Sequence, residues 1–139
     1  MNREIKFRGK CVPDSKYAGE WAFGSLIVGL ECDYYILEYD DEGFTKCIVE
    51  SETVGQFTGM KDKNGREIFE GDIVEVTCLE VKQFGRKMLC SIMYDEEFAC
   101  YCFKASDRRR CMAATIPDAE IEVIGNIHEN PEMIKKDRR

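Results

Sequence analysis

Short runs of β-forming residues, each closed by glycine, asparagine or aspartate, recur along this chain and limit its fold more than any other feature. Runs rich in Ile, Val, Thr, Tyr and Phe are typical of strands. Apolar and polar residues alternate over 73–76 and 121–123, as expected of strands with one buried face. The predicted strands are 5–8, 21–28, 34–39, 45–49, 53–58, 67–79, 87–103 and 121–127. This pattern predicts a mainly β fold: a small SH3-like β-barrel packed with additional N-terminal antiparallel strands.

Three turn signals separate these runs. Asn64-Gly65 is the strongest, and its tolerance of two successive positive φ angles predicts a type I′ hairpin turn. Asp40-Asp41-Glu42-Gly43 predicts a second, looser turn. Gly71-Asp72 interrupts an apolar run and predicts a bend or bulge, which is where a small barrel turns a corner.

Helical signals are few. Asn130-Pro131-Glu132 fits an N-cap followed by proline at the first helical position, which predicts a short C-terminal helix. The arginines of 108–110 break any core pattern in 106–117, so that segment is predicted as a loop or a short exposed helix. Without a flexible linker, residues 1–139 are expected to form a single compact domain. An N-terminal β segment 1–58, a barrel-like segment 59–128 and a tail 129–139 are the alternative subdivision.

Composition bounds the class of protein. The 139 residues are 44% hydrophobic and carry a formal net charge of −7, which allows a core and opposes bulk attraction to nucleic acid or anionic membranes. The start of the chain is charged and resembles no signal peptide, and no apolar run is long enough to cross a membrane. We therefore expect a cytoplasmic protein with no membrane association.

Eight cysteines are many for a chain of this length. Most lie in apolar runs, which favours reduced, buried thiols. The spacing of Cys100 and Cys102 places both thiols on one face of a strand, so a metal site there is the first alternative, and a disulfide or redox role is the second. No zinc-binding Cys-x-x-Cys pair occurs, and no metal or cofactor is predicted.

No motif for catalysis emerges. The single histidine, His128, follows a predicted strand and has no evident orienting residue, so it is interpreted as a surface or interface side chain. An alignment of Glu38, Asp40, Glu42 and Gly43 on a calcium loop fails because Val49 occupies the twelfth position. The basic clusters 108–110 and 135–139 could contact phosphates, but solvated charge is the favoured interpretation. No catalytic, cofactor-binding or metal-binding residue is assigned.

Three stretches of the sequence stand out together: 3–10 followed by 21–26, the long block 52–74, and 123–132. They resemble the YopX family of bacteriophage and prophage proteins. They cover about half of the chain, whereas 80–119 matches no family pattern, so its role stays open. The resemblance implies a small, mainly β, phage-encoded protein whose activity is not established, and it supplies no functional residues. Glycines in the middle block predict fixed backbone geometry, with display of a binding loop at 58–64 as the alternative.

These observations predict a non-enzymatic protein that acts by binding another protein, from host or phage, or by self-association. Exposed edges of small sheets commonly pair with other chains, which supports this interpretation. The alternative is a nucleic-acid-binding accessory protein that uses 108–110 and 135–139, although the acidic balance makes nucleic acid a less favoured partner.

Overall fold

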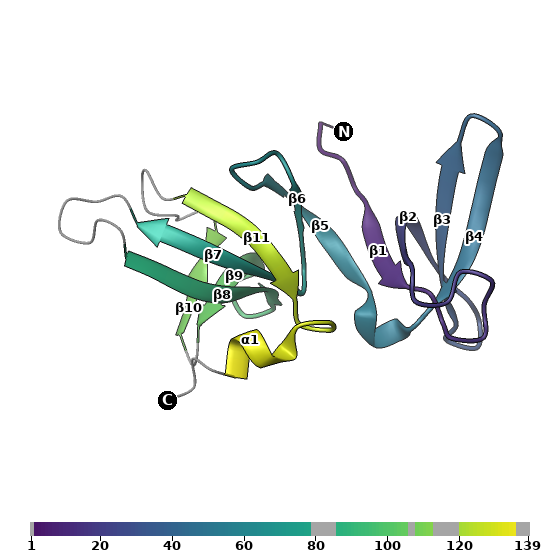
Figure 1. Ribbon diagram of the computed structural model, residues 1–139. Helices are drawn as coiled ribbons and strands as arrows, with labels where there is room; N and C mark the ends of the chain where they lie inside the picture. The colour runs from purple at the N-terminus through teal and green to yellow at the C-terminus, as the bar shows by residue number, and fades with distance from the viewer. Residues whose placement is uncertain (1, 79–85, 106–107, 113–119, 136–139) are drawn as a thin grey trace. The chain divides into compact units, whose positions relative to one another are not determined.

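The computed structural model describes residues 2–78, 86–105, 108–112 and 120–135, which form eleven strands, a 3-10 helix and a short α-helix (Figure 1). The first six elements are β1 (Phe7–Lys10), β2 (Trp21–Val28), β3 (Tyr34–Asp40), β4 (Gly43–Val49), η1 (Ser51–Thr53) and β5 (Gly55–Lys61). The others are β6 (Glu67–Phe69), β7 (Asp72–Cys78), β8 (Arg86–Asp95), β9 (Cys100–Ala105), β10 (Arg108–Cys111), β11 (Glu120–Asn126) and α1 (Pro131–Lys135).

The chain divides into two compact units, Met1–Gly59 and Met60–Arg139. Two sheets are present, with strand orders β4-β3-β2-β1-β5-β6 and β10-β9-β8-β7-β11. The assigned strand pairs are antiparallel. The mainly β prediction is therefore confirmed, and so is the short helix after Asn130. In the described part of the chain neither sheet closes on itself, so the SH3-like barrel stays a prediction.

In unit 1, successive side chains of each strand point to opposite faces of the sheet, and one of these faces packs into a small core. Its buried members are Cys11, Ala22, Ile36, Cys47 and Val49. A bridge from Cys11 to Val49, with the Val12 amide donating to the Ile48 carbonyl at 3.0 Å, brings the chain after β1 against β4. The sheet therefore curls around this core and leaves its other face outward.

Two strands approach each other closely at Gly24 in β2. A Cβ placed there would lie 2.0 Å from the carbonyl oxygen of Leu37 in β3, and the φ of Gly24 is +157°. A main-chain oxygen cannot move aside as a flexible side chain can. Only glycine therefore permits this β2–β3 pairing.

Unit 2 has its own core between β6 and the five-stranded sheet. Its buried residues include Ile68, Val74, Cys90, Ile92 and Phe103. Gly71 has a φ of +89° and separates β6 from β7, which confirms the predicted interruption at Gly71-Asp72. The Asp72 carboxylate accepts a hydrogen bond from the Phe69 amide at 2.8 Å, which holds this bend together.

The turn after β5 differs from the type I′ prediction. Gly65 has a positive φ of +81°, whereas Asn64 is not among the residues with positive φ, so the two successive positive angles of a type I′ turn are missing. Asp62 explains the difference. One carboxylate oxygen accepts hydrogen bonds from the amides of Asn64 and Arg66, both at 2.9 Å, and this fixes a longer loop.

In three other segments the structure differs from the sequence prediction. The strand predicted at 53–58 begins at Gly55, because the Thr53 hydroxyl donates to the Glu50 carbonyl at 2.6 Å and closes η1. The run 87–103 is two strands, separated by a turn that the Asp95 carboxylate organises by accepting from the Glu97 amide. Within 106–117, predicted as a loop or an exposed helix, residues 108–111 form β10, because main-chain pairing with β9 tolerates outward-facing arginines.

Candidate functional site

The outward face of β2, β3 and β4 is apolar along three adjacent strands. Ile27, Tyr35 and Ile48 lie directly opposite one another in the register. Two residues along, the next row is Ser25, Leu37 and Lys46, and Tyr39 then faces Phe44. Because opposite residues in antiparallel strands share a face, these eight side chains form one surface, here called the outer face.

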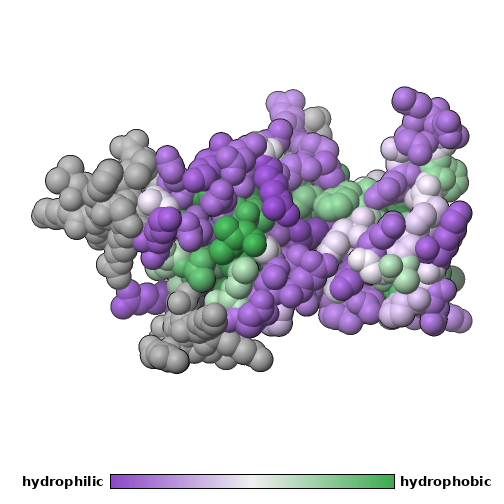
Figure 2. Space-filling model, viewed as in Figure 1, coloured by the Kyte–Doolittle hydropathy of each residue, from purple (hydrophilic) through white to green (hydrophobic). Residues whose placement is uncertain are grey.

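Four of the six apolar side chains of the outer face are exposed. Tyr39 is 71% exposed and Phe44 is 65% exposed, Ile27 and Ile48 are also exposed, and Tyr35 and Leu37 are half-buried. In Figure 2 hydrophobic residues are visible just below the tip of the β3–β4 hairpin. The Tyr39 and Phe44 rings pack at 6.0 Å, and Lys46 Nζ lies 4.4 Å from the centre of the Tyr35 ring. A contiguous, exposed apolar surface of this kind is characteristic of protein-binding sites.

The sequence analysis did not single out the outer face, although a signal was present. Tyr35, Leu37 and Tyr39 alternate with the buried Ile36, so both faces of β3 carry large apolar or aromatic residues. Such a strand is normally covered on both sides. Here the outward side is open in unit 1, and this discrepancy identifies the surface.

The Cys11 thiol of unit 1 is held in its protonated form. Cys11 and Cys47 line a cavity of about 120 Å³ together with Tyr17, Glu20, Trp21, Ala22, Glu38 and Thr45. Burial, the neighbouring Cys47 thiol and the carboxylates of Glu20 and Glu38 together raise the pKa of Cys11 to about 11, with burial as the largest cause. The Cys11 thiolate, which nucleophilic catalysis requires, is therefore scarce at neutral pH.

The predicted burial of the cysteines is confirmed for Cys11, Cys47, Cys90 and Cys102, whereas Cys32 is exposed. Cys100 and Cys102 do share one side of β9, with their sulfurs 3.7 Å apart. Among the described residues no group of three or more His, Cys, Asp or Glu side chains is arranged to hold a metal ion. The metal alternative at Cys100 and Cys102 thus gains no support.

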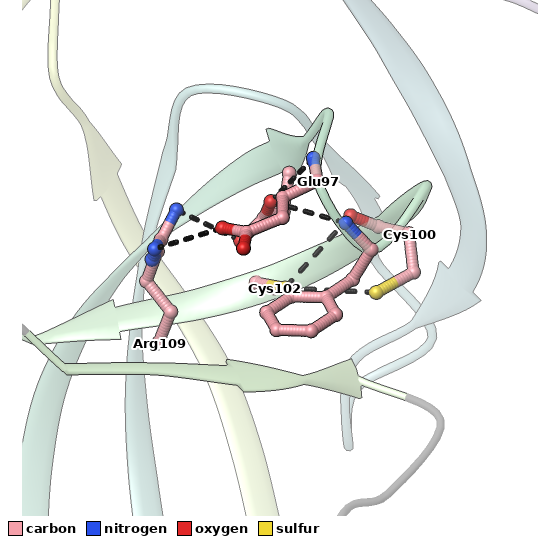
Figure 3. Close-up of polar contacts among 6 residues, drawn as sticks. Glu97, Cys100, Cys102 and Arg109 are labelled. Atoms are coloured by element: carbon pink, nitrogen blue, oxygen red, sulfur yellow. Dashed lines mark hydrogen bonds and ion pairs between the residues drawn. The ribbon is translucent and has the colours of Figure 1, made fainter.

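Arg109 of the basic cluster 108–110 is engaged within unit 2 (Figure 3). Its Nη1 lies 2.9 Å from Oδ2 of Asp95, a carboxylate with 1% exposure, and its Nη2 lies 3.8 Å from Oε2 of Glu97. The carboxylates of Asp95 and Glu97 thus offset the positive charge with which Arg109 would attract a phosphate. The other basic cluster, 135–139, falls outside the described side chains, so its role stays a prediction.

The remaining candidates occupy turns. His128 follows β11, where Oδ1 of Asn126 accepts hydrogen bonds from the amides of His128 and Glu129. The acidic residues considered as a calcium loop form the β3–β4 hairpin: Asp40 faces Gly43, and Oδ1 of Asp40 accepts from the Glu42 amide. Of the loop predicted at 58–64, residues up to Lys61 continue β5, and Asp62 is buried.

Comparison with known proteins assigns the chain to a family. The two antiparallel sheets and the outer face define a small β protein, and the YopX protein family model matches residues 7–135. The chain therefore belongs to the YopX family, which confirms the resemblance in its sequence. No curated protein matches it. No helix in the described ranges has the length and apolar character needed to cross a membrane.

Two solved structures share the fold. Protein EF1440 from Enterococcus faecalis superposes with a TM-score of 0.58 and 24% identity, covering 96% of this chain and 99% of that one. Protein yopX from Bacillus subtilis superposes with a TM-score of 0.58 and 16% identity, covering 95% of this chain and 96% of that one. These likenesses concern the fold alone.

Proposed function

We propose that this YopX-family chain is a non-enzymatic protein that acts by binding protein, either a second copy of itself or another chain, through the outer face of β2–β4. The exposure of Tyr39 and Phe44 at the hairpin end of an apolar sheet face carries this proposal. Aromatic side chains supply much of the binding energy at protein interfaces, because they bury a large area at a small entropic cost.

The chemistry of the outer face favours protein over a small ligand. A ligand site is normally concave, with a few converging polar groups. The outer face is instead a row of opposed strand residues, with Lys46 as its charged member. A sheet face with aromatic residues and one cation resembles the centre of a protein interface, which is depleted in charge.

The proposal retains three finer expectations. The chain is encoded by a phage or prophage, it acts in the cytoplasm, and its second sheet belongs to an SH3-like barrel. Catalysis is not part of the proposal, because burial keeps the Cys11 pKa at about 11 and the nearby carboxylates oppose its ionisation. Nucleic-acid binding through 108–110 is weakened by the two acidic partners of Arg109.

A matched pair of substitutions tests the proposal. Phe44 and Phe98 are 65% and 67% exposed, but Phe44 lies on the outer face and Phe98 lies in the β8–β9 turn. We expect wild-type protein to form an oligomer in light scattering or to retain a protein from host lysate. Phe44→Ser should abolish that association and Phe98→Ser should preserve it. A strict monomer that retains no protein, or equal losses from both variants, would contradict the proposal.

A further inference from the structure

Three cysteine thiols meet where β9 and β10 pair. Cys100 and Cys102 project from one side of β9 (Figure 3), and their sulfurs lie 3.7 Å apart. Cys111 of β10 lies directly opposite Cys102 in the register. The Cys111 thiol also hydrogen-bonds the Cys100 thiol, and none of these three cysteines is in a disulfide. The fold thus assembles a thiol cluster from two strands.

Strand geometry separates the pairs that can form a disulfide from those that cannot. Residues two apart on one strand have Cα atoms about 6.6–6.8 Å apart and parallel Cβ vectors. A disulfide needs Cβ atoms about 3.5–4.5 Å apart, which excludes Cys100 with Cys102. Directly opposite residues have Cβ atoms about 4.5–5.5 Å apart, which meets the disulfide range at its upper end, whereas diagonal neighbours are about 7–8 Å apart and lie well outside it. Cys102 and Cys111 are the opposite pair, and Cys100 and Cys111 are diagonal.

We propose that Cys102 and Cys111 form a reversible cross-strand disulfide by exchange with a low-molecular-weight disulfide. The Cys111 thiol, which is only partly buried, loses its proton to water, and its sulfur attacks one sulfur of the oxidant. One small thiolate leaves and takes up a proton. Cys102 then loses its proton, and its sulfur attacks the Cys111 sulfur and expels the second small thiol. The two protein thiols lose two electrons, and the small disulfide gains them.

The exposure of these cysteines and the pKa of the Cys100 thiol decide which of them attacks first, which attacks second and which stays reduced. Cys102 is 1% exposed, so the small disulfide cannot reach it directly. It reacts only after Cys111 has formed a mixed disulfide beside it. Hydrogen bonding by Cys111, burial and Cys102 raise the pKa of Cys100 to about 12, which keeps that thiol protonated and slow to attack. Cys100 is therefore expected to remain reduced beside the disulfide.

The disulfide would join the outermost strand of the sheet to its neighbour. β10 ends the order β10-β9-β8-β7-β11 and is four residues long. A short edge strand opens more easily than a central one. Oxidation should therefore raise the thermal midpoint of unfolding, and reduction with dithiothreitol should return it to the starting value.

Peptide mapping tests the proposal directly. The full chain is incubated with glutathione disulfide, quenched in acid, alkylated and digested with trypsin. Cleavage after Lys104 and after the arginines of β10 leaves Cys102 and Cys111 on separate peptides, and fragment spectra distinguish Cys102 from Cys100. We expect a Cys102–Cys111 cross-link with Cys100 alkylated. A Cys100–Cys111 cross-link, a stable glutathione adduct on Cys111, or no oxidation would overturn the proposal.

Single variants provide the control. Cys100→Ser should keep the cross-link, and Cys102→Ala and Cys111→Ser should each abolish it. Because Cys102→Ala alters a buried position, circular dichroism must show that this variant is folded. Cys111→Ser changes a partly exposed residue and serves as the second variant. Retention of a cross-link to residue 102 in Cys111→Ser would also overturn the proposal.

Discussion

The carboxylate of Asp62 accepts a hydrogen bond from the main-chain amide of Val123 at 3.0 Å, across 61 positions of sequence. Its other oxygen accepts from the amides of Asn64 and Arg66. Asp62 is therefore both the organiser of the loop after β5 and a tie between this loop and β11. In addition, the Lys63 amide donates to the Ile121 carbonyl at 2.8 Å, so the loop joins β11 at two points.

Replacing Asp62 should destabilise the protein strongly. Asp62→Ala leaves three amides without their acceptor, one of them in a buried setting, and we expect the free energy of unfolding to fall by about 2–4 kcal/mol. Urea denaturation measures this change. Lys63→Ala is the matched control in the same loop, because it removes only a surface ion pair at 3.8 Å, and it should cost no more than about 0.5 kcal/mol. Equal losses would contradict the role of Asp62.

The contribution of Asp62 should depend on pH. Burial by itself would raise its pKa, but hydrogen bonds from Val123, Arg66 and Asn64 outweigh that effect and lower the pKa below its ordinary value of 3.8. A lowered folded-state pKa means that the stabilisation is complete above the unfolded pKa and is lost as pH falls through the folded one. The stability difference between wild type and Asp62→Ala should therefore shrink below about pH 4. A difference that is constant or grows on acidification would refute this.

Arg109 should stabilise the β8–β9 turn through Asp95. Removing the arginine leaves a carboxylate of 1% exposure without its cation, although two main-chain amides still donate to it. Because Arg109 is itself 40% exposed, we expect Arg109→Ala to cost about 1–3 kcal/mol, less than the loss of a fully buried partner. Arg109→Lys should recover part of this. Glu97→Ala, at an exposed and longer contact, should change stability little in the same chemical denaturation series.

Two glycines with positive φ should respond very differently to alanine. Gly24→Ala places a Cβ 2.0 Å from a carbonyl oxygen, and we expect a loss of about 3 kcal/mol or more. Gly59 has a φ of +89° but no atom within 4 Å, so Gly59→Ala should cost only the conformational penalty of about 1–2 kcal/mol. Thermal unfolding ranks the two. Similar midpoints would show that the β2–β3 approach is less tight than described.

Much of this architecture follows from local sequence. Alternation and turn residues predict most strands, and the proline after Asn130 predicts the helix, because each depends on neighbouring residues. The type I′ prediction failed because the Asp62 carboxylate holds the Asn64 and Arg66 amides in a longer loop, and the same carboxylate is tied to Val123, a distant partner that no local pattern reveals. Residues 108–110 were not predicted as a strand because they pair with β9 through main-chain hydrogen bonds, which require no apolar alternation in the sequence. The outer face was missed because apolar alternation does not say which face a neighbouring element will cover.

The central claim, that the outer face binds protein, is tested most directly by photo-cross-linking in the native host cell. A benzophenone amino acid replaces Phe44 in one variant and the equally exposed Phe98 in another, and adducts are identified by mass spectrometry. The account predicts one dominant adduct, to a second copy of this chain or to another protein, from position 44 and none from position 98. No adduct from position 44, or the same adducts from both positions, would contradict it.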